Sequence, residues 1–232
     1  MWCKHCSLET NEQSCPVCGF QTDEDVPVRV YWCSECAIPV IYQVNAADKG
    51  ICPICGRKTY KLTFDLRPVF PEERLLLALF LGENAEKYMN RSVWAENSSY
   101  YIDGKPLSIP VQAFAEADAD KISKRVAASQ DAIDYTAYNE SIRLFIRANQ
   151  RRLDYLKDEV FSFVQQAVKG YREENIVISF SGGKDSTVTA DIVTKALSNP
   201  SLVHIFCNTT LEFPATIEYA NRYRNAHPLL LN

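Results

Sequence analysis

The chain has 232 residues, of which 47% are hydrophobic and 23% are charged, as is usual for a globular protein. Its net charge of −4 excludes a basic surface spread over the whole molecule, although a local basic patch is compatible with it. The longest apolar run, residues 75–81, is far shorter than the roughly 20 residues that a membrane-spanning helix needs. The N-terminus lacks the apolar core of a signal peptide, so we expect a cytoplasmic protein with no membrane partner.

The N-terminal part of the chain is rich in cysteine. Because cytoplasmic thiols stay reduced, the nine cysteines need an explanation other than disulfides. Eight of them form four Cys-x-x-Cys pairs before residue 56, and the ninth is Cys207. The spacing predicts two metal sites, one in a module of residues 1–26 and one in a ribbon of residues 27–67. Their expected ligands are Cys3, Cys6, Cys15 and Cys18 for the first, and Cys33, Cys36, Cys52 and Cys55 for the second.

Zinc is the metal that these sites predict, because Zn²⁺ favours four thiolates in a tetrahedron. Each site includes one Cys-Pro-x-Cys-Gly turn, starting at Cys15 and at Cys52. Iron is the alternative metal, since knuckles of this form resemble those of rubredoxin. Free or redox-active cysteines and a different pairing of the knuckles are further alternatives. Four protein ligands leave no open position, so we expect a structural role, with His5 as an exposed turn residue.

The middle of the chain, residues 68–130, has an α+β pattern. Residues 72–81 are expected to form a short helix that ends at Gly82. Asp103-Gly104 lies between two strand-like runs, residues 100–102 and 107–109, which predicts a hairpin. We expect one helix over residues 113–129 and a long one over residues 137–169, where apolar residues recur at intervals of three and four.

The last part of the chain, within residues 131–232, alternates strands and helices. Apolar strands are expected at residues 176–180 and 202–207, and a third strand begins at 229–231. Helices are expected from about residue 186 to 198 and from Pro214 onward. This order predicts a parallel sheet. Because such a domain has on the order of 100–150 residues, we expect it to continue beyond residue 232.

A glycine loop follows the first of these strands. The sequence Ser181-Gly182-Gly183-Lys184-Asp185-Ser186 allows several main-chain amides to converge on one anion at the start of a helix. Lys184 adds a full positive charge, and the two serine hydroxyls can donate hydrogen bonds. The loop is not a Walker motif, because Ile178 and Asp185 stand where that motif has glycine and Ser or Thr. A plain serine–glycine turn is the alternative.

In this setting the loop resembles the PP-loop of the adenine-nucleotide alpha-hydrolase superfamily. That superfamily includes ATP pyrophosphatases, tRNA-thiolating enzymes and sulfonucleotide reductases. Residues 206–214, Phe-Cys-Asn-Thr-Thr-Leu-Glu-Phe-Pro, resemble the segment after the second strand of phosphoadenosine phosphosulfate (PAPS) reductases. There an Asp-Thr pair precedes Phe-Pro-Glu-Thr; here Asn208 replaces the aspartate and Ala215 the glutamate. The resemblance covers about residues 135–232, and zinc ribbons also precede PAPS-reductase-like domains in prokaryotes.

The resemblance implies an α/β fold with a doubly wound parallel sheet, cut here at its third strand and preceded by two small zinc-ribbon modules and the α+β middle region. It implies catalytic roles for Lys184 and Asp185. It implies nucleotide contacts from Ser179, Ser181, Gly182, Gly183, Lys184, Asp185, Ser186, Asn208 and Thr209.

Two activities follow from the resemblance. A reductase binds PAPS or adenosine phosphosulfate, attacks its sulfur with a cysteine near the C-terminus, and uses a thiol donor such as thioredoxin as its partner. An adenylating enzyme binds ATP with Mg²⁺ and releases pyrophosphate. No cysteine follows Cys207, which we expect to be a small buried residue, so the reductase activity needs sequence beyond residue 232.

Two further interpretations stay open. In the first, the enzyme modifies RNA, which is bound by the zinc ribbons and by a basic helix face with Arg143, Arg147 and Arg151. Lys121, Lys124 and Arg125 form a second basic cluster. The acidic total favours ordinary solvated faces over RNA binding. In the second interpretation, the protein is a non-catalytic scaffold that senses nucleotide.

Overall fold

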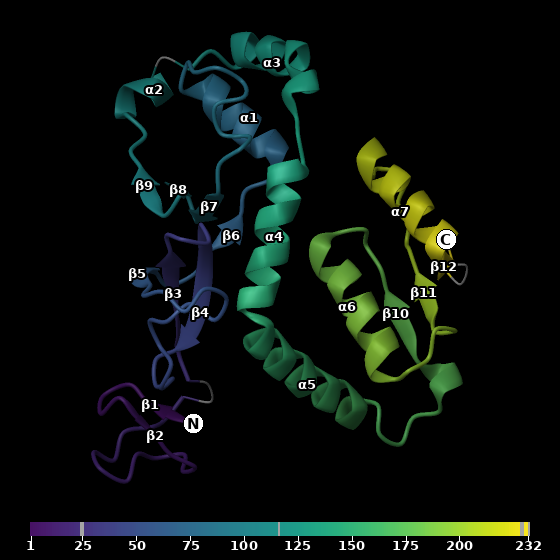
Figure 1. Cartoon of the computed structure of the whole chain (residues 1–232). Coiled ribbons are helices and arrows are strands. Elements are labelled where there is room, and N and C mark those ends of the chain that lie inside the picture. The colour runs from purple at the N-terminus through teal and green to yellow at the C-terminus, as the bar shows by residue number, and fades with distance from the viewer. Residues whose placement is uncertain (24–25, 116, 228–229, 232) are drawn as a thin grey trace. The chain divides into compact units, whose positions relative to one another are not determined.

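The computed structural model describes residues 1–23, 26–115, 117–227 and 230–231. It is a mixed α/β protein with two compact units, residues 1–152 and residues 153–232 (Figure 1). The four-part division at residues 26, 67 and 130 stays a prediction. Within the described part of the chain, no helix has both the length and the apolarity that crossing a lipid bilayer requires.

The first cysteine module is built from very short strands. Strand β1 (Trp2–Cys3) pairs antiparallel with β2 (Leu8–Glu9). The main chains of Trp2 and Asp23 exchange two hydrogen bonds, of 2.7 and 2.8 Å. The described hydrophobic residues that the module buries are Trp2, Cys3 and Cys15. So small an apolar core contributes little free energy of folding, which makes the module dependent on another source of stability.

The second module is a three-stranded antiparallel sheet. Strand β3 (Val28–Cys33) lies between β4 (Ile38–Gln43) and β5 (Tyr60–Thr63). β-branched and aromatic residues fill β3, and they favour a pleated, half-buried surface. Trp32 is only 1% exposed, and Ile38 and Val40 are equally buried. The ribbon therefore has an apolar core in addition to its cysteines.

A four-stranded antiparallel meander follows, with strands β6 (Arg67–Pro68), β7 (Val93–Glu96), β8 (Ser99–Ile102) and β9 (Lys105–Leu107). The predicted hairpin is confirmed: Asp103 and Gly104 connect β8 to β9 with φ of 48° and 75°. The predicted helix at residues 72–81 is confirmed as α1 (Pro71–Phe80). Its Leu77 packs in one cluster with Val93 of the sheet.

The ribbon packs directly against the turn of this hairpin. A Cβ atom added to Gly104 would lie 2.4 Å from Cδ1 of Trp32, so only glycine fits there. The hydroxyl of Tyr60 donates a 3.0 Å hydrogen bond to the carbonyl of Gly104. The hydroxyl of Thr63 donates to the carboxylate of Glu96. Ribbon and meander are therefore joined by both packing and hydrogen bonds.

Several helices follow the meander: α2 (Val111–Ala115), α3 (Ala119–Ala128), the 3₁₀ helix η1 (Gln130–Ala132), α4 (Thr136–Ala148) and α5 (Gln150–Ala167). The expectation of one helix over residues 113–129 is wrong. A new helix starts at Ala119, because the carboxylate of Asp118 accepts the amide of Lys121 at 2.9 Å and caps it. The expectation of one helix over residues 137–169 is also wrong, since Asn149 interrupts it with φ −109° and ψ 15°.

Asn149 interrupts the helix because its side chain bonds to the ribbon. Its carboxamide oxygen accepts the amide of Ile41 at 2.7 Å. Its nitrogen donates to the carbonyls of Pro39 at 3.1 Å and Phe145 at 2.8 Å. Asn149 is 3% exposed, and β4 is an edge strand of the ribbon. The side chain thus takes the place of a neighbouring strand for the edge of β4.

The second unit alternates strands and helices as predicted. After η2 (Glu173–Asn175) come β10 (Val177–Ser179), α6 (Lys184–Ala196), β11 (Val203–Ile205), α7 (Pro214–Ala226) and β12 (Leu230–Leu231). β10 pairs with β11, and β11 with β12, both in parallel. Leu229, the first residue of the expected third strand, lies outside the described residues.

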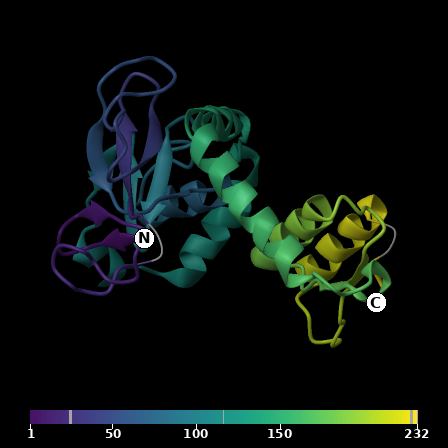
Figure 2. The same cartoon turned by 90° about the horizontal axis from the view of Figure 1, so that it is seen from below.

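The core of this unit lies on one face of the sheet. Ile178 and His204 are 4% and 2% exposed, and they form neighbouring positions on β10 and β11. Helices α6 and α7 both contribute to this side, Ala190 and Ala220 being buried (Figure 2). The three strands lie in chain order, so the reversal of order that defines a doubly wound sheet is not among them.

Candidate functional site

The fold brings each predicted set of four cysteines together. Within each set, all the sulfur atoms lie within 4.8 Å of one another. The sets are Cys3, Cys6, Cys15 and Cys18 in the first module, and Cys33, Cys36, Cys52 and Cys55 in the ribbon. The pairing of knuckles predicted from the sequence is therefore confirmed. Four thiolates at such distances suit tetrahedral coordination, so each set can hold one zinc ion.

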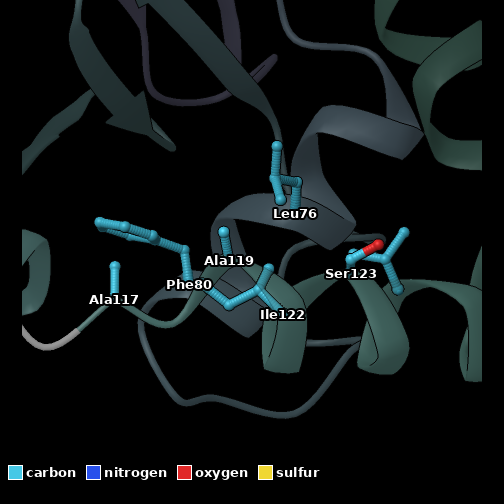
Figure 3. Close-up of a pocket in the computed structure, with 7 residues that line it drawn as sticks. Leu76, Phe80, Ala117, Ala119, Ile122 and Ser123 are labelled. Atoms are coloured by element: carbon cyan, nitrogen blue, oxygen red, sulfur yellow. The ribbon is translucent and has the colours of Figure 1, made fainter.

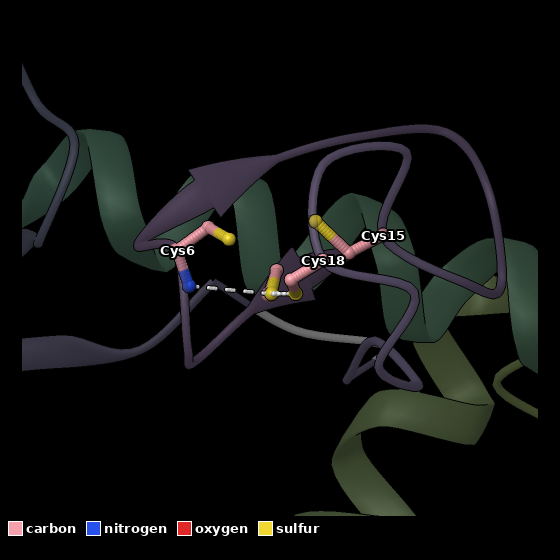
Figure 4. Close-up of side chains that lie close together, drawn as sticks. Cys6, Cys15 and Cys18 are labelled. Carbon is pink, nitrogen blue, oxygen red and sulfur yellow. Dashed lines mark hydrogen bonds between the residues drawn. The ribbon is translucent and has the colours of Figure 1, made fainter.

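The two sites repeat the same local hydrogen bonds. In the first module, the amide of Cys6 donates to Sγ of Cys3 over 3.4 Å (Figure 4). In the ribbon, the amide of Cys36 donates to Sγ of Cys33 over 3.5 Å. In the second knuckle, Gly19 and Gly56 have φ of 73° and 69° and donate to the carbonyls of Cys15 and Cys52. Glycine adopts this backbone conformation at little cost, which explains the Cys-Pro-x-Cys-Gly pattern. His5 is exposed, as expected.

The thiols influence one another's ionisation. The amide of Cys18, pointing at Sγ of Cys15, lowers the pKa of Cys15 to about 7. A hydrogen bond with the Cys18 thiol raises the pKa of Cys6 to about 12. In the ribbon, burial raises the pKa of Cys36. Thiols this close together resist simultaneous ionisation, so four thiolates would need a divalent cation to offset their negative charges.

The PP-loop-like segment lies at the carboxyl end of β10, where α6 begins. Phe180 is buried, and its amide donates to the carbonyl of Ile205 at 2.9 Å. The next residues leave the core: Ser181 and Gly183 are exposed, and Gly182 has a φ of 75°. Helix α6 starts at Lys184, two residues earlier than expected, with Gly183 at its N-cap.

A small hydrogen-bond network fixes the shape of the loop. The hydroxyl of Ser186 accepts from the amide of Ser181 at 3.2 Å and lies 3.1 Å from its hydroxyl. It also donates to the carbonyl of Gly183 at 3.1 Å. The hydroxyl of Thr187 donates to the same carbonyl at 2.8 Å. The loop is therefore held in one conformation before any ligand binds.

The remaining groups of the loop are free to bind an anion. Among the described residues, the amides of Gly182, Gly183, Lys184 and Asp185 find no carbonyl or side-chain acceptor. Nζ of Lys184 and Oδ1 of Asp185 form an ion pair of 3.5 Å, and the two side chains are 88% and 92% exposed. Free amides at a helix N-terminus together with a lysine suit a phosphate or sulfate group.

The second predicted segment also follows a strand at this sheet edge. Because β10 and β11 are parallel, their carboxyl ends meet at one edge, and Ser179 pairs with Ile205 there. Asn208 and Thr209 follow β11 and are exposed. In the described structure both bond only within their own turn, where Asn208 accepts the amide of Thr210 at 2.9 Å. The fold thus places the two segments at one edge without joining Asn208 or Thr209 to the loop.

Helix α7 contributes residues that sequence reasoning missed. The methyl group of Thr216 would lie 3.1 Å from a Cβ added to Gly182, so the helix packs tightly against the loop. The hydroxyl of Tyr219 lies 3.1 Å from that of Thr187. The Pro214 helix start was the only sequence signal for this contact. The expectation that Cys207 is buried is wrong, because the strand ends at Ile205 and Cys207 is exposed.

The basic residues considered for RNA binding are not equivalent. Arg125 donates to the carbonyls of Leu79 and Glu83 at 3.3 and 3.2 Å, so it closes the end of α1. Arg143 and Arg147 of α4 are exposed, and no carboxylate among the described residues pairs with them. Within the second basic cluster, Arg125 therefore has a structural role.

Two hollows of the described structure are lined by residues of the first unit. The first, about 470 Å³ in volume, is apolar and lies between α1 and α3 (Figure 3). It is lined by Leu76, Phe80, Ala117, Ala119, Ile122, Ser123 and Val126. The second, about 410 Å³, is polar, but its Arg91 is paired with Asp103 and its Asp134 accepts the amide of Thr136. Neither hollow offers a row of unpaired amides like that of the loop.

Comparisons with known proteins found one family model and two relatives that match parts of the chain. Residues 175–230 match the family model of the phosphoadenosine phosphosulfate reductase domain. The uncharacterized protein MJ0973 of Methanocaldococcus jannaschii is 32% identical over 94 residues, which is 40% of this chain and 22% of that protein. The uncharacterized protein MJ0066 of the same organism is 32% identical over 84 residues, 36% of this chain and 17% of that protein.

The matches cover only part of this chain and a small part of its relatives. The chain spans about a fifth of the length of the curated relatives it matches. No solved structure matches the chain. The matched segment of the family model contains β10, the loop, α6, β11 and α7, and so includes every predicted nucleotide-contacting residue.

Proposed function

We propose that this protein is an enzyme that binds an adenine nucleotide through residues 181–186, because residues 175–230 match the model of the phosphoadenosine phosphosulfate reductase domain. The observation that carries the proposal is the group of four unpaired amides between Gly182 and Asp185 at the start of α6. An anion bound there gains several hydrogen bonds and the favourable end of the helix dipole. The two cysteine sites would hold structural zinc, and the thiols they need would stay reduced in the cytoplasm.

The proposed roles of the charged residues differ. Lys184 would contact a phosphate or sulfate oxygen with its exposed ammonium group. Asp185 would repel a naked polyphosphate, so its carboxylate supports binding only through a cation such as Mg²⁺. Ser179, Asn208 and Thr209 would line the same sheet edge on the nucleotide side. The nucleotide would be ATP, PAPS or adenosine phosphosulfate.

Sulfonucleotide reduction or sulfur transfer is the reaction class we propose. In the reductive reaction a thiolate attacks the sulfur of the phosphosulfate, the phosphate oxygen leaves, and an enzyme thiosulfonate forms. A second thiol, from a donor such as thioredoxin, then attacks the cysteine sulfur of this intermediate. Sulfite leaves, and a disulfide forms between the cysteine and the donor. Residues 208–232 contain no cysteine, so the first thiol would not come from this segment.

Adenylation is the second candidate reaction, and the exposed Lys184–Asp185 pair is compatible with it. A substrate oxygen would attack the α-phosphorus of ATP, and pyrophosphate would leave with Mg²⁺. On the full-length protein, sulfite release from PAPS or adenosine phosphosulfate would identify the reductase. Pyrophosphate release from ATP would identify the adenylating enzyme. A protein that binds nucleotide and releases neither product would be a sensor.

Calorimetry with ATP, PAPS and adenosine phosphosulfate side by side tests the binding site. We expect Lys184→Ala to weaken binding roughly tenfold to a hundredfold, because it removes a charge-assisted hydrogen bond. Lys169→Ala is the matched control, since Lys169 is also exposed but lies outside the loop. We expect Asp185→Asn to abolish the Mg²⁺ dependence of ATP binding. Unchanged affinity in Lys184→Ala, with all three nucleotides, would reject the site.

A further inference from the structure

An exposed aromatic ring on the zinc ribbon has two cations close to it. Phe64 directly follows β5 and is 59% exposed. The guanidinium carbon of Arg29 lies 4.3 Å from the centre of the ring, and Nζ of Lys61 lies 5.4 Å from it. Tyr31 and Lys61 are paired across β3 and β5, so they share one face of the sheet. The ribbon thus presents a partly exposed aromatic ring with two positive groups over it.

The chain around this ring is locally basic although the protein is acidic overall. Arg57, Lys58 and Lys61 are the only charged residues between positions 56 and 64, and Arg57 and Lys58 are exposed. In the described structure, no carboxylate forms an ion pair with these residues or with Arg29. The name "ribbon patch" is used here for Arg29, Arg57, Lys58, Lys61 and Phe64.

Two carboxylates lie near the ribbon patch in sequence or in space, and neither forms an ion pair with it among the described residues. Glu96 is the last residue of β7, and its carboxylate accepts from the hydroxyl of Thr63 and, at 3.2 Å, from the amide of Asp65. Asp65 itself follows the ring and is exposed. A lysine on an edge strand can have the sole role of preventing another strand from pairing there. That role does not explain why a large apolar ring stays in solvent beside the cations.

We propose that the ribbon patch binds single-stranded nucleic acid. Nucleobases stack on exposed aromatic rings without regard to sequence, while lysine and arginine follow the phosphates. Phe64 would stack a base, and Arg29, Arg57, Lys58 and Lys61 would contact the backbone. The proposal goes beyond the nucleotide-binding function and is independent of it, because the two sites lie in different compact units.

Fluorescence anisotropy with the full zinc-loaded chain tests this inference. The probes are labelled single strands of RNA and of DNA, roughly 12 nucleotides long and of mixed sequence. We expect Phe64→Leu, which keeps an apolar side chain but removes the ring, to weaken binding at least about fivefold. Phe64→Tyr keeps a stacking surface and should bind like the wild type. Comparing the RNA and DNA probes shows whether the 2′-hydroxyl is recognised.

Salt dependence tests the electrostatic part. Each phosphate contact on a single strand contributes about −0.7 to the slope of log affinity against log salt concentration. We therefore expect Arg57→Ala/Lys58→Ala to reduce the slope by roughly 1.4. The charge-matched control is Lys121→Ala/Lys124→Ala on α3, which should leave affinity and slope unchanged.

Three results would overturn the proposal. The first is absence of saturable binding to either probe at about 50 mM salt. The second is equal affinity of Phe64→Leu and the wild type. The third is loss of binding in Arg143→Ala/Arg147→Ala but not in the ribbon variants, which would place the nucleic acid on α4. Thermal melts of all variants check that the ribbon is folded. Nucleotide binding at the loop should be unaffected in every ribbon variant, so failure of one proposal leaves the other standing.

Discussion

The two cysteine modules contain nearly identical knuckles in very different surroundings. In both, a glycine with φ near 70° closes the second knuckle, and the four sulfurs lie within the same distance of one another. The first module adds only two-residue strands and a few buried residues. The ribbon adds a three-stranded sheet with Trp32 at its core, packed against Gly104 of the meander. An exposed hydrogen bond from Asn45 to Glu9 joins the two modules.

This difference separates two tasks that a structural metal can perform. In the first module, the metal would take the place of an apolar core. The free energy of metal binding would then supply the free energy of folding of this module. In the ribbon, apolar burial and contacts with neighbouring elements already support the sheet, and the metal would fix only the knuckles. Two sites with the same cysteine pattern can therefore contribute very differently to stability, depending on what packs around each.

Metal removal should give the largest effect and should affect the modules unequally. A structural zinc site contributes apparent binding free energy of about 10–16 kcal/mol. After chelation, we expect residues 1–23 to lose all protection from amide hydrogen exchange. Strands β3 and β4 should retain part of theirs, because Trp32 also packs against Gly104 of the meander. Hydrogen exchange measured by mass spectrometry on the full chain checks this.

Equal loss in both modules would contradict the comparison, because it would show that the ribbon also depends wholly on its metal. A pair of single variants provides the control. Cys6→Ser should unfold the first module only, and Cys36→Ser should disturb the ribbon knuckles more than its strands. Restoring zinc should recover protection in the wild type.

Gly104→Ala should give the next largest effect, because it breaks the packing that supports the ribbon. Its Cβ would lie 2.4 Å from the ring of Trp32, and its φ of 75° is strained for any residue with a side chain. Overpacking and strain together should lower the free energy of unfolding by about 3 kcal/mol. Tryptophan fluorescence during urea unfolding measures this, since Trp2, Trp32 and Trp94 all lie in the first unit.

Gly82→Ala is the matched control for this variant. Gly82 has a φ of 74°, but nothing lies within 4 Å of an added Cβ. We expect it to cost only the backbone strain, about 1 kcal/mol. Equal losses in the two variants would mean that the contact between the hairpin turn and Trp32 does not stabilise the ribbon.

Local features of the fold could be predicted because they depend on a few adjacent residues. Asp103-Gly104 determines the hairpin, Pro71 fits the first turn of α1, and Gly182-Gly183 allows the loop after β10. The grouping of the cysteines followed from ligand spacing. Each of these signals acts through backbone conformation or metal geometry within one short segment.

The features that were missed depend on distant parts of the chain. Periodicity predicted one helix through Asn149, but its carboxamide bonds with residues 39 and 41, more than 100 positions earlier. Thr216 and Tyr219 reach the loop only because α7 packs beside α6. Cys207 is exposed because the strand ends two residues before it. Sequence periodicity contains no information on such contacts, since it reports only which face of an element is apolar.

Asn149→Ala should give the smallest of the three effects and tests the other support of the ribbon. The variant leaves the amide of Ile41 and the carbonyl of Pro39 without their present partners at a buried edge. Losing these hydrogen bonds should lower the free energy of unfolding by about 2 kcal/mol. Asn139→Ala is the control, because Asn139 is exposed on the same helix and should have little effect. If Asn149→Ala were as stable as the wild type, the edge of β4 would not need this helix, and the hairpin turn would be the main support of the ribbon.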